Sequence, residues 1–254
     1  HPRAHGLPEP SDVFGESDTH RSKPTLRSQL FVLKQPIVWV LGAACGMMYV
    51  SRYAINSWGL LYLQEAKGYS TIDAGFALSA YPVLGLAGAV LAGVISDRVF
   101  QSRRGPVAAV LYGCMLLGAI VLVFAFRTPA VGWIVVLMSM CVIGVHGMLS
   151  GTASMDFGGK KNVGVAVGII DGFVYAGTAT MAIIYRSVLP NDSDKVAAAN
   201  PDNWVWWPGM MIPVALIGLI LAARLWNAKP KGKTPTAVAP EGAAPNDKAA
   251  EAAG

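Results

Sequence analysis

An arginine inside an apolar stretch is the residue of this sequence with the clearest chemical use. In CGMMYVSRYAINSWG, Arg52 follows Cys45 and Tyr49 and precedes Asn56, at intervals of 4, 3 and 4 residues, which places all four on one helix face. A guanidinium presents a planar fork of donors that binds a phosphate dianion through paired charge-assisted hydrogen bonds. This face therefore predicts an anion site, although snorkelling of Arg52 to an interface beside Trp58 remains an alternative.

A second polar set lies in GVAVGIIDGFVYAGTATM. Asp171, Tyr175 and Thr178 follow helical spacing on the side that also carries Gly164 and Gly168. The glycines allow close packing, and the other three side chains offer polar contacts. An acidic group in an apolar segment needs a positive partner, a hydrogen bond or a proton, and a pairing that only holds helices together stays open.

A histidine and three cysteines complete the chemically interesting groups. His146 in GVHGMLSGTAS can contact a ligand or form an interhelical hydrogen bond. The cysteines lack the CxxC spacing of metal and redox sites, and we interpret them as packing residues. No nucleophile and base pair or metal-ligand set is apparent, so the sequence predicts no enzyme, no cofactor and no metal.

The composition indicates what surrounds these groups. Hydrophobic residues make up 54% of the 254 residues and charged residues only 14%, where about 25% is usual for soluble domains. The net charge is +5, but the basic residues lie between the apolar runs and do not share one face. This distribution argues against nucleic-acid binding. An integral membrane protein is predicted. A central Arg in hydrocarbon costs from about 2.5 to more than 10 kcal/mol, so Arg52 should face a wet cavity or a partner.

The apolar runs predict the fold class, an all-α membrane protein with a bundle of six transmembrane helices. Each run is close to the 20 or so residues that cross a bilayer, and they cover residues 37–62, 72–95, 106–126, 131–155, 163–187 and 204–226. We expect three regions: a cytoplasmic linker at 1–36, the bundle at 37–226 and a disordered cytoplasmic tail at 227–254. All seven Trp lie near predicted helix ends, where interfaces favour them.

Basic residues predict the orientation. Of the 20 Lys and Arg, 15 fall on the side shared by the linker, the loops after the second and fourth helices, and the tail, while 4 fall on the other side. The positive-inside rule then places both termini in the cytoplasm. We expect a multi-pass protein of the cell (inner) membrane.

The loop after the second helix carries a family signature. GVISDRVFQSRRGP resembles the cytoplasmic loop motif of the major facilitator superfamily, in its carboxy-terminal-half version. Together with this loop, YVSRYAINSWGLLYLQE, KKNVGVAVG and GFVYAG resemble the organophosphate:inorganic phosphate antiporters, the family of bacterial glycerol-3-phosphate and hexose-6-phosphate transporters. The resemblance implies the second half of a twelve-helix transporter, whose partner is an amino-terminal six-helix half.

The resemblance also implies roles for particular residues. One Arg from each half binds the substrate phosphate in that family, and Arg52 matches the carboxy-terminal one. Tyr49 and Tyr175 match tyrosines that line the cavity, while His146 and Asp171 are expected to tune selectivity or protonation. The residues of the implied cytoplasmic gate are Asp97, Arg98, Arg103 and Arg104.

The implied function is alternating-access exchange of a phosphorylated organic solute, a sugar phosphate or glycerol phosphate, for inorganic phosphate. The chain departs from the glycerol-3-phosphate members at Pro82 and around GVHG, which leaves the organic part of the substrate open. Two alternatives remain: a sugar-phosphate sensor with the transporter fold, and a free-standing six-helix module.

Overall fold

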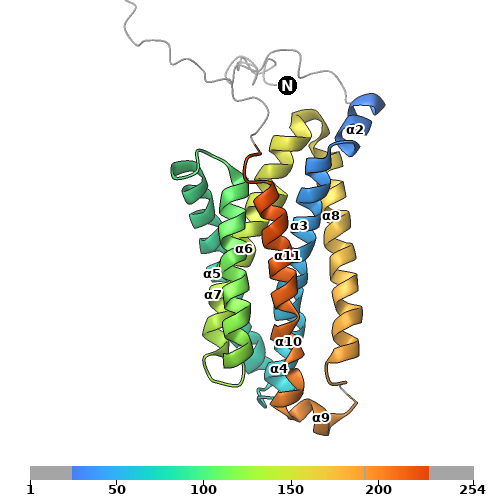
Figure 1. Ribbon diagram of the computed structural model, residues 1–254. Helices are drawn as coiled ribbons and strands as arrows, with labels where there is room; N and C mark the ends of the chain where they lie inside the picture. The colour runs from blue at the N-terminus through green and yellow to red at the C-terminus, as the bar shows by residue number, and fades with distance from the viewer. Residues whose placement is uncertain (1–24, 192, 229–254) are drawn as a thin grey trace, which may run out of the picture.

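The chain folds into a bundle of long helices, seen in a computed structural model (Figure 1). The structure describes residues 25–191 and 193–228, with side chains for all of these except 152–161. Every regular element in this part of the chain is helical. The predicted tail, apart from residues 227 and 228, and the linker up to residue 24 lie outside the described residues.

The helices are α2 (Leu26–Leu33), α3 (Pro36–Tyr53), the π-helical η3 (Ala54–Gly59), α4 (Leu60–Glu65), α5 (Thr71–Arg98), α6 (Arg104–Ala125), α7 (Val131–His146), the π-helical η4 (Gly147–Ala153), α8 (Ser154–Val188), α9 (Lys195–Ala199), the 3-10 helix η5 (Pro201–Trp204), α10 (Trp206–Gly209) and α11 (Met211–Arg224). Among the described residues, six helical stretches of 21 to 30 residues are long and apolar enough to cross a membrane. This confirms the predicted six-helix membrane bundle.

Local sequence signals begin these helices. Ser70 caps α5 by accepting a hydrogen bond from the Asp73 amide at 3.1 Å, and Pro36 occupies the first turn of α3, where no amide donor is needed. Between α5 and α6 the chain reverses through Gln101 and Ser102, whose φ angles are 54° and 61°. These caps and turns bring consecutive spans back across the bundle.

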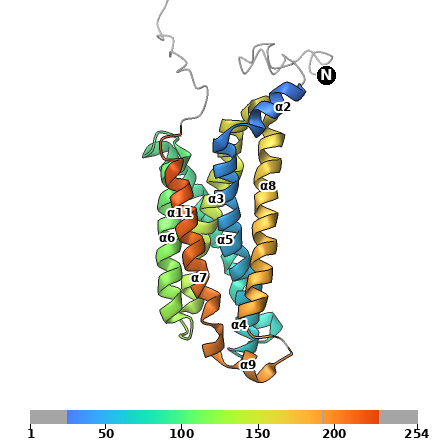
Figure 2. The same cartoon turned by 45° about the vertical axis from the view of Figure 1, so that its right-hand side comes forward.

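Helix pairs pack closely through glycine. α3 lies between α8 and α11, α5 packs on α7, and α6 packs on α7 and α11 (Figures 1 and 2). A Cβ at Gly88 of α5 would lie 2.3 Å from the Met140 carbonyl oxygen of α7, and one at Gly105 of α6 would lie 2.1 Å from the Leu225 carbonyl oxygen. Only glycine allows backbones this close, as is common between membrane helices.

The end of the bundle that carries α4 and α9 is closed by aromatic side chains. Trp204 and Trp207 are each 1% exposed, and their indole nitrogens donate hydrogen bonds to the carbonyls of Ala198 and Ala54, both at 2.9 Å. Trp207 also stacks on Tyr62, with ring centroids 5.0 Å apart. These two Trp lie near the end of a span, as expected, but their rings are buried against the neighbouring helices.

Three local features differ from the sequence prediction. The end of the predicted linker contains α2, an eight-residue helix capped by Thr25. Residues expected to form a loop after the fourth span are helical, since α8 follows η4 directly. The last span is interrupted, because Pro208 and Pro213 replace amide donors and the chain forms η5 and α10 before α11.

Candidate functional site

Arg52 lies near the middle of the 30-residue span Pro36–Glu65. Its guanidinium carbon is 5.3 Å from the centroid of the Tyr49 ring, and its Nη1 donates to the Tyr49 hydroxyl at 3.5 Å. Both side chains are partly exposed. The predicted neighbour relation between Arg52 and Tyr49 is therefore present, and it leaves most of the guanidinium donors available.

His146 of α7 joins this pair. Its ring packs edge-on against Tyr49, with centroids 5.4 Å apart and an interplanar angle of 75°. The charges of Arg52 and Asp171 both act electrostatically on His146. Its Nδ1 is buried and has no hydrogen-bond partner among the described residues. The imidazole thus has a polar atom that a ligand or water can satisfy.

Asp171 approaches the same region from α8. Its charge acts on Cys45, Tyr49 and His146. The Asp171 side chain is exposed, and in the described part of the chain it forms no ion pair. The alternative, in which Asp171 only holds helices together through an ion pair, thus finds no positive partner on the described helices.

Two tyrosines of this region were missed by the sequence reasoning. Tyr53 stacks on Tyr49, with ring centroids 6.1 Å apart, and is 38% exposed. Tyr81 of α5 lies within electrostatic range of Arg52, and its buried hydroxyl has no partner among the described residues. Two features of the sequence could have pointed to them: Tyr53 directly follows Arg52, and Tyr81 is a phenol within an apolar span, next to Pro82.

Tyr175 and Asn56 are not brought into contact with this group. Tyr175 is 72% exposed on α8, one helical turn after Asp171. Asn56 is exposed and belongs to η3, which begins at Ala54. A π-helical turn is only slightly longer than an α-helical one, so positions four residues apart still lie near one face. The shared face of Asn56 and Arg52 thus stays a prediction, and buried Cys45 lies at the packed edge of this face.

The face of α8 that carries Asp171 is open. A Cβ added at Gly164, Gly168 or Gly172 would have no neighbour within 4 Å. The close packing predicted for Gly164 and Gly168 is thus absent among the described residues. The same helix packs tightly on its other side, where a Cβ at Gly177 would lie 3.1 Å from the Gly46 carbonyl oxygen.

Both central residues precede a π-helical segment. Arg52 comes two residues before η3, and His146 comes directly before η4. Such segments widen a helix and leave backbone groups without their usual partners, and they are frequent at functional sites. The carbonyl of Ala54 at the start of η3 accepts the indole N–H of Trp207.

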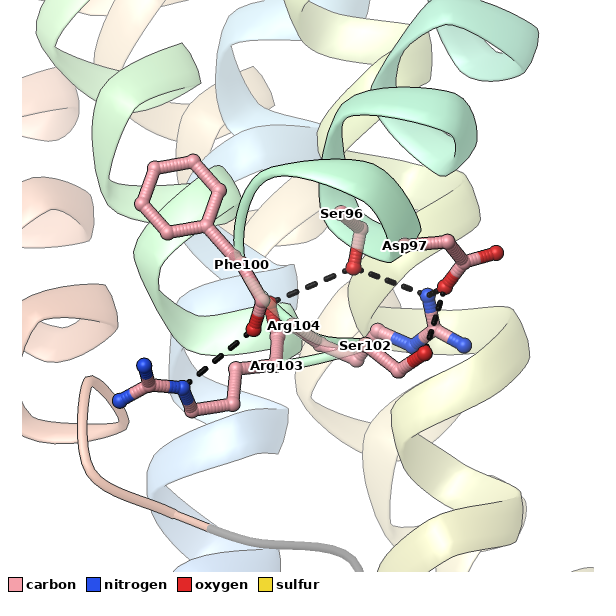
Figure 3. A network of polar contacts seen from close by, with 6 residues as sticks. All are labelled: Ser96, Asp97, Phe100, Ser102, Arg103 and Arg104. Atoms are coloured by element: carbon pink, nitrogen blue, oxygen red, sulfur yellow. Dashed lines mark hydrogen bonds and ion pairs between the residues drawn. The ribbon is translucent and has the colours of Figure 1, made fainter.

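The turn between α5 and α6 holds a second polar group (Figure 3). Arg104 Nη1 pairs with Asp97 Oδ1 at 3.0 Å and bonds Ser96 Oγ at 2.9 Å. Ser102 Oγ donates to Asp97 Oδ1 at 2.9 Å. Side-chain exposure is 16% for Arg104 and 58% for Asp97, so the ion pair lies at the surface of a packed turn.

The other two arginines of the predicted gate behave differently. Arg103 Nε donates to the Phe100 carbonyl at 3.3 Å, while Ser96 Oγ donates to the Arg103 carbonyl, also at 3.3 Å (Figure 3). Arg98 is exposed in the last turn of α5. The structure therefore joins Asp97 to Arg104, whereas Arg103 bonds within the turn and Arg98 is exposed.

This arrangement suits anion binding. Among the described residues, no group of three or more His, Cys, Asp and Glu could hold a metal ion. A cation in mid-span, several phenols and an imidazole form a polar surface that can hold a phosphoryl group through charge and hydrogen bonds.

Comparison with known proteins identifies the class. The family model described as Major Facilitator Superfamily matches residues 4–182. The chain therefore belongs to the major facilitator superfamily, as its six-helix bundle and its α5–α6 turn indicate.

The relatives narrow this further. The chain is 31% identical over 247 residues to the "Probable hexose phosphate transport protein" of Chlamydia trachomatis, covering 89% of this chain and 52% of that protein. It is 30% identical over 240 residues to the glycerol-3-phosphate transporter of Bacillus subtilis, covering 89% and 51%. It is 29% identical over 199 residues to the membrane sensor protein UhpC of Escherichia coli, covering 77% and 42%. Within the superfamily, the chain is similar to proteins named as hexose phosphate and glycerol-3-phosphate transporters, and it spans about half the length of these relatives.

Proposed function

We propose that this chain supplies the carboxy-terminal half of a transporter that exchanges a phosphorylated organic solute for inorganic phosphate. The solute is a sugar phosphate or glycerol phosphate, the classes that the names of its relatives carry. The observation that carries the proposal is Arg52, a partly exposed cation near the middle of a membrane span, resting on Tyr49 beside His146.

The charge of the substrate determines how many cations the site needs. Arg52 supplies one positive charge, and a phosphate dianion requires a second, which the family resemblance assigns to an Arg of the amino-terminal half. Tyr49 and Tyr175 donate hydrogen bonds and shape the cavity. Tyr53 and Tyr81 add phenols to its wall, and His146 and Asp171 tune protonation or selectivity.

The same charges favour exchange over one-way release. An empty site leaves Arg52 unpaired in a poorly hydrated part of the bilayer, which costs several kcal/mol. The two halves therefore rock more easily when an anion is bound. Each solute that leaves is then replaced by a phosphate before the transporter reorients.

The open face of α8 supports an amino-terminal partner. Its glycines have no neighbours in the described chain, and Asp171 and Tyr175 are exposed beside them. A second six-helix half packed on this face would turn it into one wall of a closed cavity. The length of the relatives, about twice that of this chain, agrees with this arrangement.

Orientation in the inner membrane is part of the proposal. α2 and the end of α11 lie at one end of the bundle, and α4 and α9 lie at the other (Figures 1 and 2). We place the first end, with the α5–α6 turn, the segment before α2 and the tail, in the cytoplasm because of its excess of basic residues. The Asp97–Arg104 pair then lies where a cytoplasmic gate opens and closes.

A sensor is the second candidate, because one relative is named a membrane sensor protein. The test joins the chain to its amino-terminal half in proteoliposomes loaded with inorganic phosphate. The proposal predicts efflux of labelled phosphate that depends on external sugar phosphate or glycerol phosphate. Saturable binding of those solutes without efflux would favour the sensor and contradict the transporter. Efflux from the six-helix chain alone would support the free-standing module.

A further inference from the structure

An amphipathic helix lies at the start of the first membrane span. α2 packs on the beginning of α8, where Val32 is 1% exposed and forms a small apolar cluster with Val38 and Ala166. Ser28 Oγ donates to Asn162 Oδ1 at 3.1 Å across the same contact. One side of α2 is thereby fixed to the bundle, and its orientation relative to α3 and α8 is defined.

The other side of α2 carries two cations separated by apolar residues. Arg27, Leu30, Phe31 and Lys34 are spaced by 3, 1 and 3 residues, so they share one face of the helix. Arg27 and Lys34 lie two turns apart, about 10 Å along the axis. Leu30 is 46% exposed and Phe31 58% exposed between them.

This face borders a shallow cavity of about 550 Å³, which we call the α2 groove. Its lining residues are Thr25, Arg27, Ser28, Leu30, Phe31, Lys34 and Asn162. None of these carries a negative charge. The groove thus offers two positive charges, several hydrogen-bonding groups and an apolar floor.

The position of the α2 groove indicates its surroundings. It lies just before Pro36, where the first membrane span begins. Trp39 is 46% exposed one turn later, and its indole nitrogen donates to the Leu33 carbonyl at 2.8 Å. An exposed Trp at the end of a span marks the level of the lipid headgroups. The apolar residues of α2 then face the boundary between headgroups and acyl chains.

We propose that the α2 groove binds an anionic phospholipid. Arg27 and Lys34 hold its phosphate and headgroup, while Leu30 and Phe31 contact the upper part of an acyl chain. Basic grooves beside membrane helices recognise lipids in this way. A free phosphate ion would use the two cations but leave the apolar floor exposed, so the groove fits a lipid better. This inference depends on the membrane spans and not on the proposed exchange reaction.

The test measures lipid binding by the purified chain in neutral detergent, using native mass spectrometry with phosphatidylglycerol and phosphatidylcholine as probes. A basic residue near an anionic lipid contributes about fivefold in affinity. The wild-type chain should therefore prefer phosphatidylglycerol by about tenfold or more. The double variant Arg27→Gln/Lys34→Gln should lose most of this preference, and Arg27→Lys/Lys34→Arg should keep it.

A matched control removes the same charge elsewhere. Arg186→Gln/Arg224→Gln alters two exposed arginines outside the α2 groove and should keep the preference. Equal loss in this control, or no loss in the Arg27/Lys34 variant, would overturn the proposal. If the Gln pair does not fold, as judged by circular dichroism, Lys34→Gln alone should lose about fivefold, and an unchanged preference would overturn the proposal.

Two further measurements distinguish a lipid from other possible occupants of the α2 groove. Inorganic phosphate at the lipid concentration should not displace phosphatidylglycerol; displacement would identify an anion site and overturn the lipid proposal. Loss of the preference after joining the amino-terminal half would identify an internal interface and also overturn it. Because no transport is measured, failure of the exchange assay leaves this result unchanged, and Arg52→Lys should retain lipid binding.

Discussion

Arg52 rests on the ring of Tyr49, one helical turn before it in α3. The guanidinium carbon is 5.3 Å from the ring centroid, and the hydrogen bond to the phenol oxygen is long, at 3.5 Å. No other hydrogen bond holds Arg52 among the described residues. The ring therefore restrains the guanidinium through a cation–π contact while its fork stays available for a ligand.

The orientation of the bundle predicts which sites react from outside. Single cysteines in place of Ser102, in the α5–α6 turn, and Ser193, before α9, should label from opposite sides after the three native cysteines are replaced. We expect an impermeant maleimide to label Ser193→Cys in intact cells and Ser102→Cys only in inside-out vesicles. Labelling of both positions from outside would contradict the proposed topology.

The contact of His146 with Tyr49 predicts a pH-dependent contribution to anion binding. An imidazole changes charge between pH 5 and 8, and its protonated form adds a positive charge beside Arg52. In the joined transporter, His146→Gln should therefore weaken phosphate binding more at acidic pH than at pH 8, by up to about fivefold, roughly 1 kcal/mol for one full charge. Protonation of the phosphate itself cancels, because it is the same for both proteins.

The control for this effect is His20→Gln, which removes an imidazole from the amino-terminal segment. It should leave the ratio of affinities at the two pH values unchanged. If His146→Gln keeps the wild-type pH profile, His146 has only a packing role. Asp171 would then be the remaining candidate for the group that causes the pH dependence.

The Asp97–Arg104 pair should matter for transport more than for stability. Asp97 is largely exposed, so Asp97→Asn should change the free energy of unfolding by less than about 1 kcal/mol. As part of a gate, it should slow phosphate exchange severalfold. Asp202→Asn breaks a similarly exposed pair, Arg127–Asp202 at 2.9 Å, at the other end of the bundle. Equal exchange rates for the two variants would argue against a gating role.

The hydrogen bond from Trp207 to Ala54 should stabilise the π-helical segment after Arg52. Trp207→Phe keeps an aromatic ring against Tyr62 but removes the indole N–H, leaving the carbonyl without this donor. We expect a loss of about 1 kcal/mol in the free energy of unfolding in bicelles, the usual size for interhelical hydrogen bonds. Trp226→Phe, at a 41% exposed site, should cost less. A larger loss at Trp226 would contradict this assignment.

The six spans follow from the sequence because apolar runs of about 20 residues have one stable arrangement in a bilayer. The Arg52–Tyr49 contact follows as well, since the two lie one turn apart in a regular helix. The π-helical segment η3, which contains Asn56, was not predicted, because no rule of periodicity predicts such a segment. The burial of Trp204 and Trp207 was not predicted, because a position near a helix end does not tell whether a ring packs inside.

Other features depend on tertiary structure. Tyr81 comes from α5 and His146 from α7, and only the packing of these helices brings them near Arg52. α2 was hidden within a polar segment because eight residues are too few for a periodic signal to stand out. The open glycines of α8 look like packing residues in the sequence, and only the structure shows that no described residue packs against them.

The most direct test of the phosphate site is Arg52→Lys in the joined, reconstituted transporter, compared at matched expression. Lys keeps the charge and a similar reach but lacks the planar fork, so a residue that only snorkels would tolerate the change. We predict phosphate binding weaker by about 1.5 to 3 kcal/mol, roughly 10- to 150-fold in Kd, with phosphate exchange severely reduced. Near-normal exchange by the Lys variant would remove Arg52 from the site and contradict the account of a phosphorylated substrate.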